Sequence, residues 1–485
     1  MNGFRTAAIW LTLLCFFISG APVSSWAITI QEEEDLSVEF LRVLKRHFIL
    51  VDDPVVVDYV DGVGRRILKA IPPQPFTYHF YVVEQDVFNA FATPAGHIFV
   101  FSGLIEALDR EEELAGILAH EIAHVQCRHI SDKIGRAKKA NMMSLAGTIA
   151  GILLGVGGMP DVGQAVAVGS AAGAQSSMLA YSRQDETQAD QFGLSNLFNA
   201  GYNGDGLVSG FEKIRSKTWF GSKDVPTYLM THPAVEDRIV GLKTQVDAYQ
   251  NANGRPPDVD NTPFIRAQSR LITNPAAAQN QLKRFEAEVQ KHPGDPMAHY
   301  RFGLMLAKVG RSNEAIAQLR SSLAGRAFDP VILGDLGRIY FLNGQYEDAV
   351  STLTSVIEMS PGDVEGEFYL GRALMETGNF IEAKGHLKTL VRDHPSYTEA
   401  YFFLGKCYDR LGEKVDSLYY LGRYYHLKGE LRKAVFQLEK AREADLSGAR
   451  AEDIQSLMDD IKGAEKEQKK RDSQERELGP RRRIG

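Results

Sequence analysis

Two histidines one helical turn apart, with a glutamate beside the first, are the residues of this chain best placed to do metal chemistry. They are His120, Glu121 and His124, in the run His-Glu-Ile-Ala-His. On an α-helix the side chains at i and i+4 lie on one face, so both imidazoles could bind the same zinc ion. Glu121 lies about 100° around the helix, where its carboxylate could accept a proton from water. The pattern predicts a zinc hydrolase site, but it is short enough to arise by chance and needs support from its surroundings.

A catalytic zinc ion usually takes three protein ligands and leaves its fourth position to water. Glu186 is the candidate third ligand, and Asp190, one turn further along, could accept a hydrogen bond from a zinc-bound histidine. The alternative is an exposed acidic helix start, which the helix dipole favours in any case. Because the histidine pair is also present, we favour the interpretation of Glu186 as a metal ligand. His129 falls half a turn from the ligand face, and a bound Cys127 would close the site, so neither is expected to bind the metal.

Two helices must position these groups. Asp109 as N-cap and Glu112 as capping carboxylate predict the start of the first helix. It continues through the histidine pair along an apolar stripe of Leu114, Ile117, Leu118, Ile122 and Val125. The second helix is predicted over 182–200, with Gly201 just beyond its end. A helix over 56–71 and strands over 76–83 and 97–101 predict a small sheet before the metal residues.

A glycine-rich segment, 141–182, separates the two site helices. It contains eight glycines and a single charge, Asp161. One interpretation is a hairpin that enters a membrane, since small residues at four-residue spacing let helices pack closely in lipid. The other is a pair of buried helices or a mobile flap over the site. We favour the second, because so many glycines dilute the hydrophobicity that a membrane span requires.

The second half of the chain repeats with a period of 34 residues. Glycines recur in register at Gly303, Gly337, Gly371 and Gly405, and again seven residues after each, at Gly310, Gly344, Gly378 and Gly412. This is the period of tetratricopeptide repeats, in which paired helices stack into a solenoid. Residues 263–295 are interpreted as a degenerate first unit, and 422–441 as a half-shifted last one. The charged tail from Lys462 is expected to be frayed or disordered.

The N-terminus is typical of an export signal. Arg5 precedes a short apolar run, and Ser25-Trp26-Ala27 predicts cleavage before Ile28. Loss of Arg5 would change the formal net charge from −7 to −8 (54 Lys+Arg against 62 Asp+Glu), and an acidic chain is a poor nucleic-acid binder. Cys127 and Cys407 would remain, either paired or as buried thiols.

Domain organisation follows from these features. We expect a mainly α protein: an α+β zincin-like protease domain with a small sheet, followed by an α-solenoid. The expected parts are a signal peptide (1–27), a metalloprotease domain (28–250), a linker (251–262), tetratricopeptide repeats (263–450) and a charged, partly disordered tail (451–485).

The motifs together resemble a known family. Leu118–His124 with Glu186 and Asp190, Thr231-His232-Pro233 and Arg238-Ile239 is similar to the HtpX-like and CAAX-prenyl-endopeptidase-like zinc metalloproteases. The resemblance implies a gluzincin-like endopeptidase with one Zn²⁺, held by His120, His124 and Glu186, with Glu121 as catalytic base and Asp190 as supporting group or proton donor. For His232 and Arg238 it implies a regulatory or transition-state contact; a plain turn histidine beside Pro233 is the alternative for His232.

A further segment, 89–98, leads in such enzymes into the strand that lines the cleft, where an extended peptide could add by backbone hydrogen bonds. Relatives often have two glycines where this chain has Ala95-Gly96.

The expected function is an endopeptidase of the periplasm, associated with the outer membrane, that degrades misfolded or stalled envelope proteins. The repeats would bind clients or the outer-membrane assembly machinery and act as a chaperone; contact of 141–182 with the membrane is a further expectation. The alternative is a chaperone or assembly scaffold in which proteolysis is secondary or absent. A third possibility is an intramembrane protease that uses 141–182 as a membrane hairpin.

Overall fold

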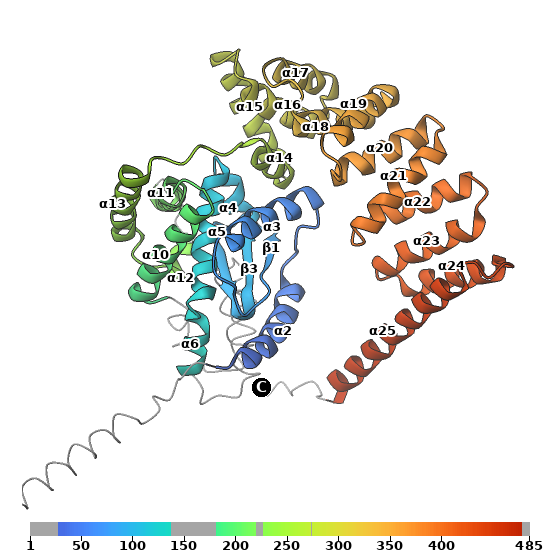
Figure 1. The fold of residues 1–485 in the computed structure, drawn as a ribbon, viewed down its shortest axis with the longest axis horizontal. Coiled ribbons are helices and arrows are strands. Elements are labelled where there is room, and N and C mark those ends of the chain that lie inside the picture. The colour runs from blue at the N-terminus through green and yellow to red at the C-terminus, as the bar shows by residue number, and fades with distance from the viewer. Residues whose placement is uncertain (1–27, 137–180, 220–226, 273, 478–485) are drawn as a thin grey trace, which may run out of the picture. The chain divides into compact units, whose positions relative to one another are not determined.

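The computed structural model describes residues 28–136, 181–219, 227–272 and 274–477 (Figure 1). The predicted signal peptide and nearly all of the glycine-rich segment lie outside these residues. Contacts divide the chain into two units, residues 1–52 with 60–259 and residues 53–59 with 260–485. The second break falls inside the predicted linker; the assignment of 53–59 to the second unit has no counterpart in the sequence analysis.

The first unit contains a three-stranded sheet with strand order β1-β3-β2. Strand β3 (His97–Phe101) pairs in parallel with β1 (His79–Val83) and antiparallel with β2 (Ala90–Thr93). Helix α2 (Ile30–His47) begins with a capping box at Thr29 and Glu32 and buries Leu36, Phe40 and Leu44 in one core with Phe99 and Phe101. Helix α3 (Pro54–Lys69) and short α4 (Ser102–Ala107) flank these strands in the chain.

The turn η1 (Pro94–Gly96) joins β2 to β3 through two residues with positive φ. Gly96 has φ 82°, where glycine meets no penalty, but Ala95 has φ 60° and ψ 28°. Alanine at position 95 therefore carries backbone strain that a glycine would avoid.

Helix α5 (Glu111–Gln126) carries the histidine pair and is buried along almost its whole length. Gly116 allows close approach to α11 (Asp205–Trp219), because a Cβ there would lie 2.6 Å from the Cα of Leu207. The predicted N-cap was wrong. Arg110 is the N-cap and has no side-chain cap bond, because a guanidinium has no acceptor; the backbone N–H of Asp109 donates to Glu113 at 2.7 Å.

Helix α10 (Arg183–Asn199) starts with a capping box formed by Ser182 and Asp185, and Gly201 follows its end with φ 74°. Its Gly193 packs on α5, where a Cβ would lie 3.2 Å from the Cα of His120. The remaining helices of this unit are α6 (His129–Arg136), α12 (Thr227–Thr231) and α13 (Val235–Asn253). Helix α13 therefore includes residues 251–253, the first residues of the predicted linker.

The second unit consists of antiparallel helix pairs, which agrees with the predicted mainly α fold (Figure 1). The helices are α14 (Thr262–Leu271), α15 (Pro275–Lys291), α16 (Pro296–Lys308), α17 (Ser312–Gly325), α18 (Pro330–Leu342), α19 (Tyr346–Met359), α20 (Val364–Glu376), α21 (Phe380–Asp393), α22 (Thr398–Arg410), α23 (Lys414–Leu427), α24 (Leu431–Ala444) and α25 (Ala451–Glu477).

The repeated glycines have two separate roles. Gly310, Gly344, Gly378 and Gly412 have φ of 77–88° and make the turns between paired helices. Those of the other set face a leucine sixteen residues later, and a Cβ would come within 2.6–3.1 Å of it: Gly303–Leu319, Gly337–Leu353, Gly371–Leu387 and Gly405–Leu421. Gly422 faces Leu438 in the same way at 2.8 Å, so the half-shifted last unit packs like the others.

The C-terminal segment differs from its expected disorder, since α25 continues past Lys462 to Glu477. Ile454, Leu457, Met458 and Ile461 recur at helical spacing and are buried, which holds the first half of this helix. Cys407 is a buried free thiol and Cys127 a partly buried one. None of the described helices has both the length and the apolar character needed to cross a membrane.

A buried ion network ties α14 to α18 and α20. Nη2 of Arg266 donates to Oε2 of Glu365 at 2.8 Å, and Nη2 of Arg270 donates to both oxygens of the same carboxylate at 2.5 Å. Asp335 is fully buried, accepts from the hydroxyl of Tyr300 at 2.7 Å and lies 3.5 Å from Nε of Arg266. The carboxylates of this solenoid face are thus matched by arginines of its own first helix.

Candidate metal centre

Four buried side chains bring potential metal-binding atoms together: His120, His124, Glu186 and His232. One nitrogen or oxygen from each lies within 4.8 Å of all the others. Helix α5 supplies the first two, the first turn of α10 supplies Glu186, and His232 follows α12. The Nε2 atoms of His120 and His124 are 3.0 Å apart, and Nδ1 of His232 is 3.0 Å from Oε1 of Glu186.

This set of donors fits a metal ion. All four side chains are at most 1% exposed; within the described residues Nε2 of His232 finds no hydrogen-bond partner, and Oε2 of Glu186 is paired with Arg238. Buried lone pairs that converge without a proton between them are unfavourable, whereas a cation at their centre would satisfy them. Histidine nitrogen and carboxylate oxygen are donors that zinc accepts.

Each of the paired histidines is oriented through its second ring nitrogen. Nδ1 of His120 lies 3.1 Å from Oδ1 of Asp190. Nδ1 of His124 lies 2.9 Å from Nδ1 of His129, whose Nε2 is 3.0 Å from the side-chain oxygen of Gln188. Such contacts hold an imidazole with its other nitrogen directed at the metal position. His129, which the sequence analysis set aside as a ligand, thus contacts the proposed ligand from behind.

Arg238 connects the two carboxylates of α10. Its Nε and Nη2 donate to the two oxygens of Asp190 at 2.7 Å each, and its Nη1 is paired with Glu186. The guanidinium also lies over the ring of Phe211, 4.5 Å from the centroid. Arg238 is therefore a positioning group in this structure: it orders Glu186 and Asp190 and supplies a positive charge beside them.

The buried charges shift one another's pKa values. Burial opposes the charged form of His120, but contacts with Asp190 and Glu186 prevail and raise its pKa to about 9. Burial likewise opposes ionisation of Glu186, yet His232, His120 and Arg238 hold its pKa well below the ordinary value. Burial lowers the pKa of His124 well below the ordinary value, so its imidazole is neutral.

Glu121 is the odd carboxylate of the site. It is fully buried, and neither of its oxygens has a hydrogen-bond partner among the described residues. Nε2 of His232 lies 3.5 Å from its Oε1, and the backbone of Ala92 also contacts the carboxylate. Burial raises the pKa of Glu121. This carboxylate has no side-chain hydrogen bond and stands beside converging metal donors, where it can exchange a proton with water.

Two tyrosines complete the walls and were missed by the sequence analysis. The ring of Tyr181 stacks on His124 with centroids 3.7 Å apart, and Tyr228 stacks on His232 at 4.2 Å. Tyr181 had been counted as the end of the glycine-rich segment. Its place directly before the capping residue Ser182 was the available signal, since the start of α10 leads straight to Glu186.

The site residues belong to a recognised class of domain. Residues 59–246 match Peptidase family M48, and residues 301–364 and 340–400 match tetratricopeptide repeats. The chain thus carries a metallopeptidase domain of family M48 followed by tetratricopeptide repeats.

Curated relatives share this arrangement to different extents. The beta-barrel assembly-enhancing protease of Escherichia coli (strain K12) is 26% identical over 322 residues, which cover 65% of this chain and 62% of the relative. A putative beta-barrel assembly-enhancing protease of Vibrio cholerae is 29% identical and covers 47% of this chain and 46% of the relative. The mitochondrial metalloendopeptidase OMA1 of Schizosaccharomyces pombe is 27% identical over 37% of this chain and 50% of its own length. The match thus spans less than two thirds of each of these relatives.

Proposed function

We propose that this chain is a zinc-dependent endopeptidase of the cell envelope. The observation that carries the proposal is the set of four buried donors, two of them on the turn of α5 that also presents an unpartnered glutamate. The match of this region to a metallopeptidase family supports the same chemistry. The ion is proposed as zinc because two imidazoles and one carboxylate are a ligand set of catalytic zinc sites.

In this proposal His120, His124 and Glu186 hold the metal. When bound, the ion would supply Lewis acidity, making water more acidic and polarising the peptide carbonyl. Glu121 takes the proton from the attacking water and passes it to the departing amine, a role that its buried and unpartnered carboxylate suits. Asp190 and His129 keep the two imidazoles in orientation, and Arg238 keeps both α10 carboxylates in place.

His232 is proposed to restrain the resting site. Its nitrogens lie 3.0 Å from Glu186 and 3.5 Å from Glu121, so it stands between a proposed ligand and the proposed base. A fourth protein donor closes a zinc site, whereas catalysis needs that position for water or substrate. His232 would then have to move away before hydrolysis, and afterwards it could contact the substrate oxyanion together with Arg238.

We propose that the protein is exported and works in the periplasm, close to the outer membrane, on misfolded or stalled envelope proteins. The proposal rests on the signal-like N-terminus and on relatives whose name refers to beta-barrel assembly. The repeats are proposed to bind clients or assembly partners, since stacked helix pairs expose a long surface for protein contacts.

The test compares Glu121→Gln with His120→Ala in protein that lacks residues 1–27. We expect Glu121→Gln to bind zinc with wild-type stoichiometry by mass spectrometry but to lose cleavage of unfolded casein by at least about a hundredfold. His120→Ala should lose both zinc and cleavage. Full proteolysis by Glu121→Gln would refute the mechanism. Restoration of every cellular phenotype by the inactive variant would instead favour the scaffold function.

A further inference from the structure

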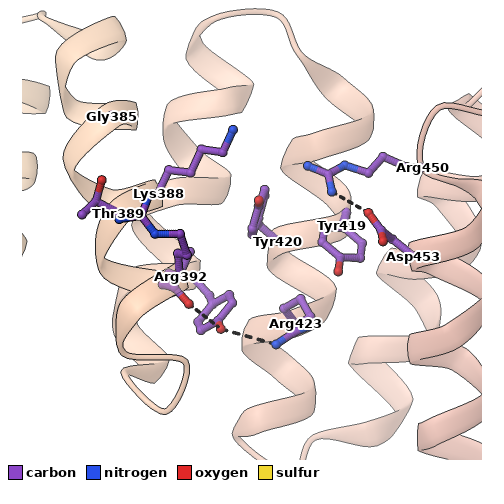
Figure 2. A pocket seen from close by; sticks show the side chains of 11 residues that line it. Gly385, Lys388, Thr389, Arg392, Tyr419, Tyr420, Arg423, Arg450 and Asp453 are labelled. Atoms are coloured by element: carbon purple, nitrogen blue, oxygen red, sulfur yellow. Dashed lines mark hydrogen bonds and ion pairs between the residues drawn. The ribbon is translucent and has the colours of Figure 1, made fainter.

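A cavity of about 540 Å³ with charged and aromatic lining residues lies in the last repeats of the solenoid, far along the chain from the metal residues. Figure 2 shows Lys388 and Arg392 on one helix, α21, and Tyr419, Tyr420 and Arg423 on the neighbouring helix α23. Tyr401 of α22 and, beyond α24, Arg450 and Asp453 also line it. The cavity thus combines tyrosine rings with four cationic side chains and one carboxylate.

Only part of this positive charge is matched. Arg450 pairs with Asp416 at 2.7 Å and with Asp453 at 2.6 Å, and Arg392 pairs with its neighbour Asp393. For Lys388 and Arg423, by contrast, no ion pair with a carboxylate is present within residues 274–477, and Arg423 hydrogen-bonds there only to tyrosine hydroxyls. The cavity therefore keeps two cationic groups without a carboxylate partner.

Arg423 is the more informative of the two. Its Nη2 donates to the hydroxyl of Tyr401 at a long 3.4 Å, and its Nε is buried with no hydrogen-bond partner in the described part of the chain. An unsatisfied buried N–H is costly unless an acceptor completes it. A guanidinium edge that offers two nitrogens matches the two oxygens of a carboxylate.

The same solenoid shows how such an imbalance is resolved elsewhere. Among the earlier repeats, Asp335 and Glu365 are buried, and the chain's own Arg266 and Arg270 neutralise them. The cavity at α21 and α23 carries the opposite charge, and the one carboxylate that lines it, Asp453, pairs with Arg450 rather than with Lys388 or Arg423. Its complement should come from another molecule.

We propose that this cavity binds an acidic peptide segment of a partner protein, with carboxylates at Lys388 and Arg423 and an apolar side chain against the tyrosines. The volume suits a short peptide stretch, whereas a single phosphate would fill only a fraction of it. Tyrosine and arginine are also the side chains that contribute most at protein interfaces. The inference adds a ligand chemistry to the protein-binding role proposed for the repeats and rests on that role, but it does not depend on the metal cluster.

Gly385 allows the cavity to be blocked without removing a charge. It lies within α21, and a Cβ there would meet no atom within 4 Å. Gly385→Leu should therefore place its side chain in open space beside Lys388 and Thr389 (Figure 2). Replacing glycine inside a helix also favours the helix, so this variant should fold.

The experiment measures binding of a fluorescein-labelled decapeptide of alternating Glu and Phe by anisotropy. It uses the full chain with Glu121→Gln, so that the probe is not cleaved. We expect Arg423→Gln, Lys388→Glu and Gly385→Leu each to raise Kd about tenfold, because each removes a contact or the space for one. Lys414→Glu, which makes the same charge change at an exposed site outside the cavity, should leave Kd within about twofold.

Three outcomes would overturn the proposal: no binding of the acidic probe, equal binding of a matched Lys-Phe peptide, or equal loss of affinity in Lys414→Glu. Stronger binding of a single-stranded oligonucleotide than of the peptide would also overturn it, in favour of nucleic acid. Casein cleavage by wild-type protein, measured separately, keeps a failure of this proposal distinct from a failure of the protease mechanism.

Discussion

Two buried clusters of charged groups in this molecule solve opposite problems. The network in the solenoid sets three arginines against four carboxylates: Arg266, Arg270 and Arg338 against Asp53, Asp335, Asp363 and Glu365. The cluster in the peptidase domain has three carboxylates and only one arginine: Glu121, Glu186 and Asp190 with Arg238. The first is balanced by the chain itself, whereas the second concentrates acceptors around histidines and needs a cation from outside.

This difference in charge balance distinguishes an ion network that stabilises the fold from a metal-binding site. Buried ions are tolerated when their partners are present, and removing one partner is what costs most. Both clusters contain buried atoms without a hydrogen-bond partner, so it is the excess of three carboxylates over one arginine that indicates a cation from outside in the second. If this comparison is right, carboxylate substitutions in the two clusters should have different consequences: loss of metal and activity in one, loss of stability in the other.

The largest effect is expected for Glu186→Gln. The amide retains the volume but replaces the carboxylate oxygen that the metal needs and leaves Arg238 with one fewer anionic partner. We expect zinc affinity to fall by at least about a hundredfold and casein cleavage to fall with it, as measured by competition with a chelating dye and by turnover. Gln191→Ala, at an exposed position of the same helix, is the control. Undiminished zinc binding in Glu186→Gln would remove Glu186 from the ligand set.

The corresponding substitution in the ion network of the solenoid is Asp335→Ala. It leaves Arg266 and Arg270 with less negative charge and deprives Tyr300 of its acceptor. We expect a loss of about 3–5 kcal/mol, seen as faster amide hydrogen exchange in α14 and α18, with zinc content unchanged. The double variant Arg266→Met with Asp335→Leu should recover much of the loss, because it removes both charges together. Equal exchange in wild type and Asp335→Ala would show that the network contributes nothing to stability.

The same network predicts a pH dependence with a definite sign. Burial opposes ionisation of Asp335, but Arg266, Arg338 and Arg270 hold its pKa below the ordinary value of 3.8. A carboxylate with a lowered pKa in the folded state contributes fully above its unfolded pKa and loses this contribution as the pH falls towards the folded value. The stability advantage of wild type over Asp335→Asn, measured by urea unfolding, should thus be constant from neutral pH to about pH 5 and shrink below 3.8. An advantage that grows on acidification would contradict this assignment.

A smaller change is expected behind the metal ligands, at His129→Ala. This variant removes the ring that contacts Nδ1 of His124 but leaves every proposed ligand in place. We expect zinc affinity to fall about 10- to 100-fold, while turnover at saturating zinc changes little. His47→Ala, on a basic helix end away from the cluster, should leave the affinity unchanged. A loss of turnover that added zinc does not restore would give His129 a role beyond orientation.

Residue spacing predicts contacts within one helix or one repeat, but not contacts between helices. The histidine pair lies on one turn of one helix, so its shared face followed from residue number alone, and the glycine period gave the solenoid in the same way. His129, Tyr181 and Arg238 act through contacts between helices, and no spacing rule specifies them. The wrong N-cap at Asp109 has a similar cause: two carboxylates, Glu112 and Glu113, could both have capped the helix start, and the fold selected Glu113.

The smallest effect concerns the backbone beside the site rather than its charges. Ala95 adopts the left-handed region, which costs a residue with a Cβ about 1–2 kcal/mol, while glycine adopts it freely but loses more entropy on folding. We expect Ala95→Gly to stabilise the first unit by about 0.5–1 kcal/mol, a rise of a few degrees in Tm. Ala92→Gly, in extended strand β2 three residues earlier, should lower Tm instead, because there glycine brings only the entropic cost. Equal destabilisation by both substitutions would mean that the turn at Ala95 is not strained.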